Sequence, residues 1–230
     1  MKTKILLLLM LGVLSISFAQ STYLLVIDSS GSMGDGIPPD YSETKMAAAK
    51  IAAKDFVDSA NGEIALMVFD ECDSGGNPSS GGIRVLQGFT TSKTSLKNQI
   101  DYLEAYADTP IADALTEAKT YLQDTKGYGT IILITDGEET CGGEPVSVAG
   151  QIYNQNVGKV HVIGYMIGGT AETTAEQIAV AGGGKYYSVD NSQELEQALQ
   201  NIRDEEEVTC CPGIALLGLL PVAVFLSRRQ

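Results

Sequence analysis

The chain has 230 residues and a formal net charge of −14, with 15 lysines and arginines against 29 aspartates and glutamates. A chain this acidic, with no basic cluster in its sequence, is not expected to bind nucleic acid or an anionic membrane face through charge. Roughly 190 residues lie between its two apolar ends, which is ample for one domain with a full core and too few for two.

The N-terminus has the pattern of a secretory signal peptide. Two lysines precede an uninterrupted apolar stretch over residues 5–14, and Ser17 and Ala19 occupy the two positions that a signal peptidase reads. The alternative, an uncleaved membrane anchor, is disfavoured because the stretch is too short to span a bilayer comfortably. We therefore expect residues 1–19 to be removed and the mature protein to act outside the cytoplasm.

The first part of the domain predicts two buried strands, a helix and an edge strand. Residues 22–27 are apolar on both faces, as in a fully buried strand, and residues 64–69 repeat this pattern. Between them, Ser42 can cap a helix that runs to about Ala60. After a loop rich in glycine and serine, residues 83–89 are expected to return as an antiparallel edge strand.

The second part alternates helices and strands regularly. Residues 95–104 predict a modest helix, and Pro110 is well placed to open another that reaches Leu122. Residues 130–135 are a third buried strand. The remaining segments follow in the order helix 145–156, strand 159–165, helix 173–181, strand 185–189 and helix 192–203.

The C-terminal segment, residues 206–230, predicts attachment to a membrane or cell surface. Its apolar run, residues 214–226, precedes two arginines, and a helix over residues 208–227 would be about 30 Å long. The layout resembles bacterial C-terminal sorting signals, with Cys210 or Cys211 as the processing or lipid-attachment position. A permanent anchor, with the arginines on the cytoplasmic side, and a buried helix of the domain remain the alternatives.

Alternating strands and helices over residues 20–205 predict a single α/β domain. We expect a doubly wound, mostly parallel six-stranded sheet with helices on both faces and one antiparallel edge strand. In such sheets a ligand binds beyond the carboxyl ends of the strands, at the point where the strand order reverses. Asp28 and Asp136 each end a buried strand, so their carboxylates meet if those two strands are neighbours at that point.

The first of these strand ends predicts a metal site. Asp28, Ser30 and Ser32 follow the buried strand at every second position, and alternate residues of an extended segment point the same way. Carboxylate and hydroxyl oxygens suit a hard divalent cation, Mg²⁺ first and Ca²⁺ or Mn²⁺ after it. Because only one of the three side chains is charged, the metal stays electron-poor and can accept an outside ligand, which indicates binding rather than hydrolysis.

Three motifs in order resemble the von Willebrand factor type A domain with its metal-ion-dependent adhesion site. They are Asp28-Ser29-Ser30-Gly31-Ser32, Asp108-Thr109-Pro110-Ile111-Ala112-Asp113-Ala114-Leu115 and Thr135-Asp136-Gly137-Glu138. The resemblance covers about residues 21–203 and includes the closing strand and helix. It implies that Thr109 joins the metal directly and that Asp136 acts through a water. Asp108 and Asp113 match no ligand position.

The resemblance implies a non-enzymatic, surface-associated module that binds a protein partner through the metal. One coordination position would stay open for a carboxylate of that partner. The alternative is a structural or assembly subunit whose metal site is vestigial. A hydrolase would need a general base beside the open position, for which Glu138 is the one plausible residue, and the glycines at 31, 34 and 36 fit neither GxGxxG nor a P-loop.

The chain departs from the family pattern in residues 34–40. These residues lengthen the link between the metal loop, residues 28–32, and the first helix. This segment adds two carboxylates near the rim of the site. Further acidic residues are expected on loops of the same face, so the rim should repel an incoming carboxylate unless the metal is bound. These residues are Glu71, Asp73, Glu138, Glu139 and Glu144.

Cys72 and Cys141 both follow strands that end at the metal-bearing rim. The context of Cys141 also looks like secreted bacterial members of the family, and an oxidising compartment permits a disulfide between the two. Two free thiols are the alternative. The single histidine, His161, lies inside a strand, and because one histidine cannot build a zinc site we expect it to have a structural role.

Overall fold

A computed structural model describes residues 20–72 and 82–209 of the chain. The predicted signal peptide, Asp73, the two cysteines of the C-terminal motif and the apolar segment after them lie outside these residues. Within the described ranges, none of the helices has both the length and the apolar character needed to cross a bilayer.

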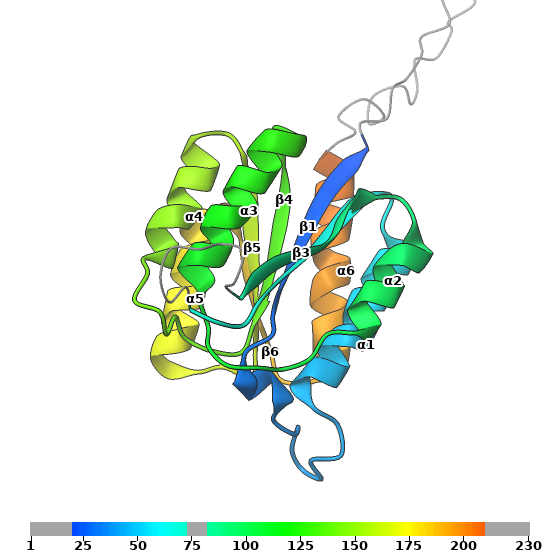
Figure 1. The fold of residues 1–230 in the computed structure, drawn as a ribbon, viewed down its shortest axis with the longest axis vertical. Coiled ribbons are helices and arrows are strands. Elements are labelled where there is room, and N and C mark those ends of the chain that lie inside the picture. The colour runs from blue at the N-terminus through cyan, green and yellow to red at the C-terminus, as the bar shows by residue number, and fades with distance from the viewer. Residues whose placement is uncertain (1–19, 73–81, 210–230) are drawn as a thin grey trace, which may run out of the picture.

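Six strands form one sheet, and all but one of them run parallel (Figure 1). Strand β3 pairs with β2 in the antiparallel sense at one edge, which confirms the prediction from the sequence. The sheet has the order β3-β2-β1-β4-β5-β6. The strands are β1 (Ser21–Asp28), β2 (Gly62–Phe69), β3 (Ile83–Thr90), β4 (Gly129–Thr135), β5 (Gly158–Tyr165) and β6 (Gly183–Val189).

Helices cover both faces of the sheet, as the alternating pattern predicts (Figure 1). Helices α1, α2 and α6 lie on one face, and α3, α4 and α5 lie on the other. A short 3₁₀ turn, η1 (Gly31–Gly34), follows β1. The helices are α1 (Lys45–Ser59), α2 (Lys93–Asp101), α3 (Ile111–Thr125), α4 (Pro145–Asn154), α5 (Gly169–Ala181) and α6 (Ser192–Thr209).

The central strand β1 explains why its sequence is apolar at every position. Leu25 and Ile27 face the core under α1 and α6, whereas Leu24 and Val26 face the core under α3 and α4. All four side chains are fully buried. A strand covered by helices on both sides therefore gains apolar burial from every residue, which is the arrangement that fixes the position of Asp28 at its end.

Several helix ends differ from the prediction. Helix α1 begins at Lys45, where the Thr44 hydroxyl accepts a hydrogen bond from the Ala47 N–H at 3.1 Å, so Thr44 and not Ser42 is the N-cap. Ser42 instead donates its hydroxyl to the Asp40 carboxylate. The prediction failed because Ser42 and Thr44 are both good caps, and the choice between them depends on the path of the preceding loop.

The other differences concern helix length. Helix α2 is capped by Ser92 and covers residues 93–101, α5 begins at Gly169 rather than Thr173, and α6 runs to Thr209 rather than Arg203. The sequence did not predict the longer α6 because residues 203–207 are all charged, so the apolar periodicity stops before the helix ends.

The last turns of α6 are held against the sheet by Glu206. This buried carboxylate accepts hydrogen bonds from Lys159 and Thr130 and lies 3.3 Å from Nε2 of His161. Burial alone would raise the pKa of Glu206, but the contacts with His161 and Lys159 outweigh it and lower the pKa to about 2. His161 thus has the structural role that the sequence predicts.

The described chain begins and ends at one pole of the domain, and β1 ends at the other (Figure 1). Asp28 is the last residue of β1 and therefore lies at that second pole. Close to the end of α6, the Glu207 carboxylate accepts a hydrogen bond from the Asn61 N–H, just before the start of β2. Strand β1 starts beside β2 at this pole, with Ser21 paired to Gly62. Its eight residues then cover about 26 Å before they reach Asp28.

Candidate metal centre

The strand order brings Asp28 and Asp136 to the same edge of the sheet. Strands β1 and β4 are parallel neighbours with Ile27 opposite Ile134, so they end together. The Thr135 hydroxyl at the end of β4 donates to Oδ2 of Asp28 at 2.6 Å. The prediction that the two carboxylates meet at the point where the strand order reverses is therefore confirmed.

The side chains of the metal loop form a chain of polar contacts. Ser30 donates its N–H to Oδ1 of Asp28 at 2.8 Å, and its hydroxyl lies 3.2 Å from that of Ser32. Ser32 in turn donates its hydroxyl to Oδ1 of Asp136 at 2.7 Å. Oxygen atoms from two strand ends therefore line one small region.

The backbone that brings these oxygens together is not extended throughout. Ser30 is extended, but residues 31–34 form the 3₁₀ turn, so the side chains converge because the chain turns back and not because they alternate along a strand. Gly31 permits this turn. A Cβ atom on it would lie 2.9 Å from the Tyr106 carbonyl oxygen, which is closer than such contacts allow.

Thr109 borders the same region from the opposite loop. A Cβ atom placed on Gly137 would lie 3.8 Å from Oγ1 of Thr109 and 4.0 Å from Oγ of Ser32, so both hydroxyls line the space above this glycine. Thr109 is held there by Thr140, whose hydroxyl accepts its N–H at 2.8 Å and whose N–H donates to its carbonyl at 3.1 Å. All the predicted ligand residues are thus brought together.

The segment before Thr109 is tied directly to the metal loop. Tyr106 donates its N–H to the Ser29 carbonyl at 2.6 Å, and Gly31 donates its N–H to the Ala107 carbonyl at 3.3 Å. Asp108 donates its N–H to the Asp70 carbonyl at 2.7 Å, which ties the same segment to the end of β2. Backbone contacts therefore fix the metal loop and the Thr109 loop relative to each other.

The residues present fit a hard divalent cation. Asp28 is fully buried, and this burial raises its pKa to about 6 although hydrogen bonds from Ser30 and Thr135 oppose the rise. A buried carboxylate whose charge is so poorly solvated gains from a bound cation. Within the described residues no three histidines, cysteines or acids gather, so the donor set is two carboxylates with hydroxyls, which suits Mg²⁺, Ca²⁺ or Mn²⁺.

Lys45 completes the site in a way that the sequence reasoning missed. Its ammonium group donates to Oδ2 of Asp136 at 2.7 Å, and the Asp136 side chain is fully buried while that of Lys45 is 13% exposed. The Asp28 and Asp136 carboxylates together with the Lys45 ammonium carry a net charge of −1, so a divalent cation would leave the centre at +1. The sequence feature that could have predicted this contact is the position of Lys45, in the first turn of the helix that follows the metal loop.

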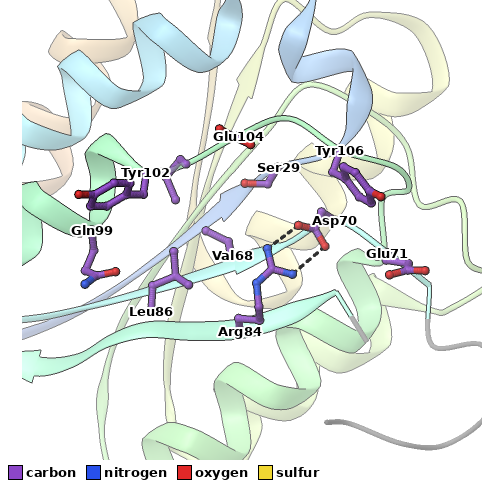
Figure 2. Close-up of a pocket in the computed structure, with 11 residues that line it drawn as sticks. Ser29, Val68, Asp70, Glu71, Arg84, Leu86, Gln99, Tyr102, Glu104 and Tyr106 are labelled. Atoms are coloured by element: carbon purple, nitrogen blue, oxygen red, sulfur yellow. Dashed lines mark hydrogen bonds and ion pairs between the residues drawn. The ribbon is translucent and has the colours of Figure 1, made fainter. Parts of the chain in front are cut away.

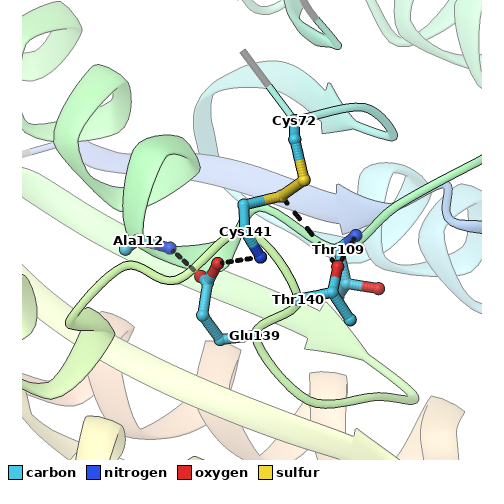
Figure 3. Close-up of a disulfide and its surroundings, with 6 residues drawn as sticks. All are labelled: Cys72, Thr109, Ala112, Glu139, Thr140 and Cys141. Atoms are coloured by element: carbon cyan, nitrogen blue, oxygen red, sulfur yellow. Dashed lines mark hydrogen bonds between the residues drawn. A yellow bond between two sulfur atoms is a disulfide. The ribbon is translucent and has the colours of Figure 1, made fainter. Parts of the chain in front are cut away.

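The Cys72–Cys141 disulfide is present, which confirms the predicted pairing and excludes two free thiols (Figure 3). It joins the loop after β2 to the loop after β4, with the two Cα atoms 5.4 Å apart. The Cys141 N–H donates to Oε1 of Glu139, whose Oε2 accepts the Ala112 N–H at the start of α3. The disulfide therefore anchors the loop whose Thr140 holds Thr109.

Two of the acidic residues predicted to surround the metal site make hydrogen bonds within the protein. Glu139 binds the N–H groups of Ala112 and Cys141, and the Glu138 carboxylate accepts a hydrogen bond from the Thr170 hydroxyl at the start of α5. Glu138 and Glu139, two of the acids predicted on this face, therefore also make hydrogen bonds within the protein.

Comparison with protein families gives one match. Residues 23–139 match the model of the von Willebrand factor type A domain. The chain is also 31% identical over 208 residues to the uncharacterized protein YwmD of Bacillus subtilis, an alignment that covers 82% of this chain and 92% of YwmD.

Solved structures share the fold at low sequence identity. The von Willebrand factor domain of the type V pili tip protein Mfa5 from Porphyromonas gingivalis is 14% identical with a TM-score of 0.69, covering 85% of this chain and 98% of that one. Proximal thread matrix protein 1 from the mussel byssus, whose adhesion-site motif holds zinc, is 18% identical with a TM-score of 0.61. That match covers 83% of this chain and 46% of the byssus protein.

Proposed function

The chain belongs to the von Willebrand factor type A domain family, and on that premise we propose that it is a non-enzymatic adhesion module that holds a protein partner through a divalent cation. The observation that carries the proposal is the continuous polar contact from the buried Asp28 carboxylate through Ser30 and Ser32 to Asp136. We place Mg²⁺ first because all these donors are oxygen atoms.

Each residue has a distinct part in the proposed site. Asp28, Ser30 and Ser32 would bind the cation directly, Thr109 would join them, and Asp136 would act through a water. The cation, when bound, supplies an electrophilic position for a carboxylate of the partner. The protein contributes a rigid, largely buried set of oxygens, because backbone contacts fix the loops that carry Ser32 and Thr109 relative to each other.

The placement of the chain ends supports a role at the cell surface. Strand β1 ends at the pole of the domain opposite the end of α6 (Figure 1), and Asp28 is its last residue. A chain attached through residues 206–230 would therefore present the centre away from the surface that holds it. Processing or lipid attachment at Cys210 or Cys211 belongs to this proposal. The likeness to a pilus tip protein is consistent with it.

The second candidate function is a structural or assembly subunit whose metal site is vestigial. Lys45 favours it, because its ammonium group already compensates the charge of Asp136 without a metal. The two functions differ in one respect that can be measured. A chelator abolishes partner binding by an adhesion module and leaves binding by a subunit unchanged.

Calorimetric titration with Mg²⁺ tests the proposed function. We expect one binding site in the full chain, and we expect Ser32→Ala to weaken Mg²⁺ binding at least about tenfold, the equivalent of about 1.4 kcal/mol for one lost ligand. Ser42→Ala is the matched control, since this exposed serine lies outside the centre and hydrogen-bonds to Asp40 in the same stretch of chain. Absence of any heat of Mg²⁺ binding in the unaltered chain would end the proposal.

Lys45→Gln should strengthen Mg²⁺ binding about tenfold. Glutamine keeps a hydrogen-bond donor for Asp136 but removes a positive charge that repels the incoming cation, an effect of order 1–2 kcal/mol between partly buried groups. The same calorimetric titration measures it. Lys54→Gln on the same helix is the control, because Lys54 pairs with the more distant Asp101. Equal Mg²⁺ affinity in both variants would show that Lys45 does not act on the site.

A further inference from the structure

A pocket of about 400 Å³ lies beside the metal loop (Figure 2). It is on the β2 side of β1, whereas Asp136 follows β4 on the other side. It is bounded by the ends of β2 and β3 and by the segment that links α2 to Thr109. Its floor is apolar and includes Val68, Leu86 and Leu103. An apolar floor under a polar mouth suits a long side chain with an aliphatic stem and a polar end.

The charged groups of this pocket leave an excess of negative charge. Arg84 and Asp70 neutralise each other, because both ends of the guanidinium donate to the carboxylate, at 3.0 and 2.5 Å. Glu71 and Glu104 are exposed at the mouth. Within the described residues, Glu104 has no hydrogen-bond or ion-pair partner. The mouth therefore attracts a cation. Arg84 does not cancel this attraction, because its own charge is already neutralised by Asp70.

Two exposed tyrosines complete the mouth. Tyr102 is 80% exposed and Tyr106 is 68% exposed, and in the view of Figure 2 they flank the pocket from opposite sides with Glu104 between them. Large exposed aromatic rings of this kind are enriched in protein-binding surfaces, and their faces attract ammonium and guanidinium groups. Tyr106 also donates its N–H to Ser29, so the mouth is fixed relative to the metal loop.

We infer that this pocket binds an arginine or lysine side chain of the protein partner. The inference rests on the proposed function only in assigning that side chain to the same partner whose carboxylate meets the metal. A partner segment with an acidic and a basic residue would then match the rim at two points. Its positive charge would also offset the repulsion between the acidic rim and the partner's carboxylate.

The test uses capped amino acids and the isotope-labelled full chain in the presence of a chelator, so that the metal site takes no part. N-acetylarginine amide is expected to shift the backbone amide signals of Glu71, Leu103 and Tyr106 in nuclear magnetic resonance spectra. N-acetylnorleucine amide, which has an apolar side chain without the charge, and N-acetylglutamate amide are expected to leave them in place.

Two double variants locate the binding. Tyr102→Ala with Glu104→Gln should weaken arginine binding about tenfold, since the variant removes both the cation–π contact and the exposed ion pair. Tyr153→Ala with Glu117→Gln removes an exposed tyrosine and glutamate on α4 and α3 and should change nothing. Both pairs of residues are on the surface, so folding is expected to survive.

Other outcomes overturn the inference. Equal shifts with norleucine would make the pocket an apolar anchor, stronger shifts with glutamate would make Arg84 an anion site, and no shift with arginine would leave no cation site at all. Failure of the Mg²⁺ titration together with intact arginine binding would overturn the metal proposal but not the pocket.

Discussion

Replacing both Cys72 and Cys141 by alanine should lower the free energy of unfolding by about 4 kcal/mol. The disulfide joins residues 69 positions apart, and closing a loop of that length removes about this much conformational free energy from the unfolded chain. In a domain of this size the loss corresponds to a fall in melting temperature of roughly 10 °C. Thermal and urea unfolding, followed by circular dichroism, measure it.

The same replacement should weaken Mg²⁺ binding by less than tenfold. Thr140, next to Cys141, holds Thr109 by two hydrogen bonds, and these survive when the disulfide is removed. Glu139 also keeps its contacts with the loop and with α3. Titrating the double variant with Mg²⁺ separates the two effects. A loss of Mg²⁺ binding much larger than tenfold, in a variant that still folds, would mean that the disulfide itself shapes the site.

An unchanged melting temperature in the double variant would contradict the first expectation. The control is the unaltered chain with and without reductant, since reduction opens the same loop and converts the disulfide to two thiols without replacing any residue. Reduction and replacement should therefore destabilise the domain by a similar amount. A difference between them would point to the packing of the sulfur atoms rather than to the loop.

The fold was predictable because the sequences of its central strands are compatible with few arrangements of strands and helices. Leu24 to Ile27 and Ile131 to Ile134 are apolar at every position, a pattern that requires burial on both faces. Strands of this kind alternating with helices allow few arrangements other than a doubly wound sheet. Once β1 and β4 are neighbours, Asp28 and Asp136 must lie together, so the sequence places the two carboxylates correctly.

The rest of the centre depends on contacts that periodicity does not encode. The turn over residues 31–34 and the pair between Lys45 and Asp136 follow from the path of the loop before α1, which a pattern of apolar residues does not describe. The same holds for the pocket beside the metal loop. It arises where the segment from α2 to Thr109 passes over β2 and β3, and nothing in its sequence marks a cavity.

Asp28→Asn should stabilise the metal-free domain by up to about 3 kcal/mol at pH 7 while abolishing its response to Mg²⁺. Burial raises the pKa of Asp28 from 3.8 in the unfolded chain to about 6 in the folded one. Each unit of that difference is worth about 1.4 kcal/mol, so folding with an ionised Asp28 costs about 3 kcal/mol at neutral pH. Asparagine carries no charge and avoids this cost, but its NH₂ group cannot accept a hydrogen bond as the second carboxylate oxygen does, which reduces the gain.

The sign of the pH dependence follows from the raised pKa. Because the folded state holds the Asp28 proton more tightly, this residue contributes stability below about pH 4, and that contribution is lost as the pH rises through about 6. Urea unfolding of the metal-free chain measures the free energy of unfolding at pH 4 and pH 7, and the contribution of Asp28 should be more favourable at pH 4. The excess stability of Asp28→Asn over the unaltered chain should therefore increase from pH 4 to pH 7.

Asp136→Asn is the matched control, because it removes the second carboxylate but should have the opposite effect on the metal-free domain. Asp136 compensates Lys45, whose ammonium would be left without its partner, so this variant should be less stable than the unaltered chain. Among the described residues, Asp136 forms an ion pair with Lys45 whereas Asp28 forms none, and this difference sets the opposite signs.

Mg²⁺ should close the gap between the unaltered chain and Asp28→Asn. At about 100 times its dissociation constant a ligand adds about 2.7 kcal/mol to stability, which is close to what the loss of the Asp28 charge contributes. The ionised Asp28 would then destabilise the metal-free domain, and a bound cation would offset this destabilisation. If Asp28→Asn proved less stable than the unaltered chain in chelator at pH 7, the buried charge would already be compensated within the protein, and the argument for a cation at this carboxylate would fail.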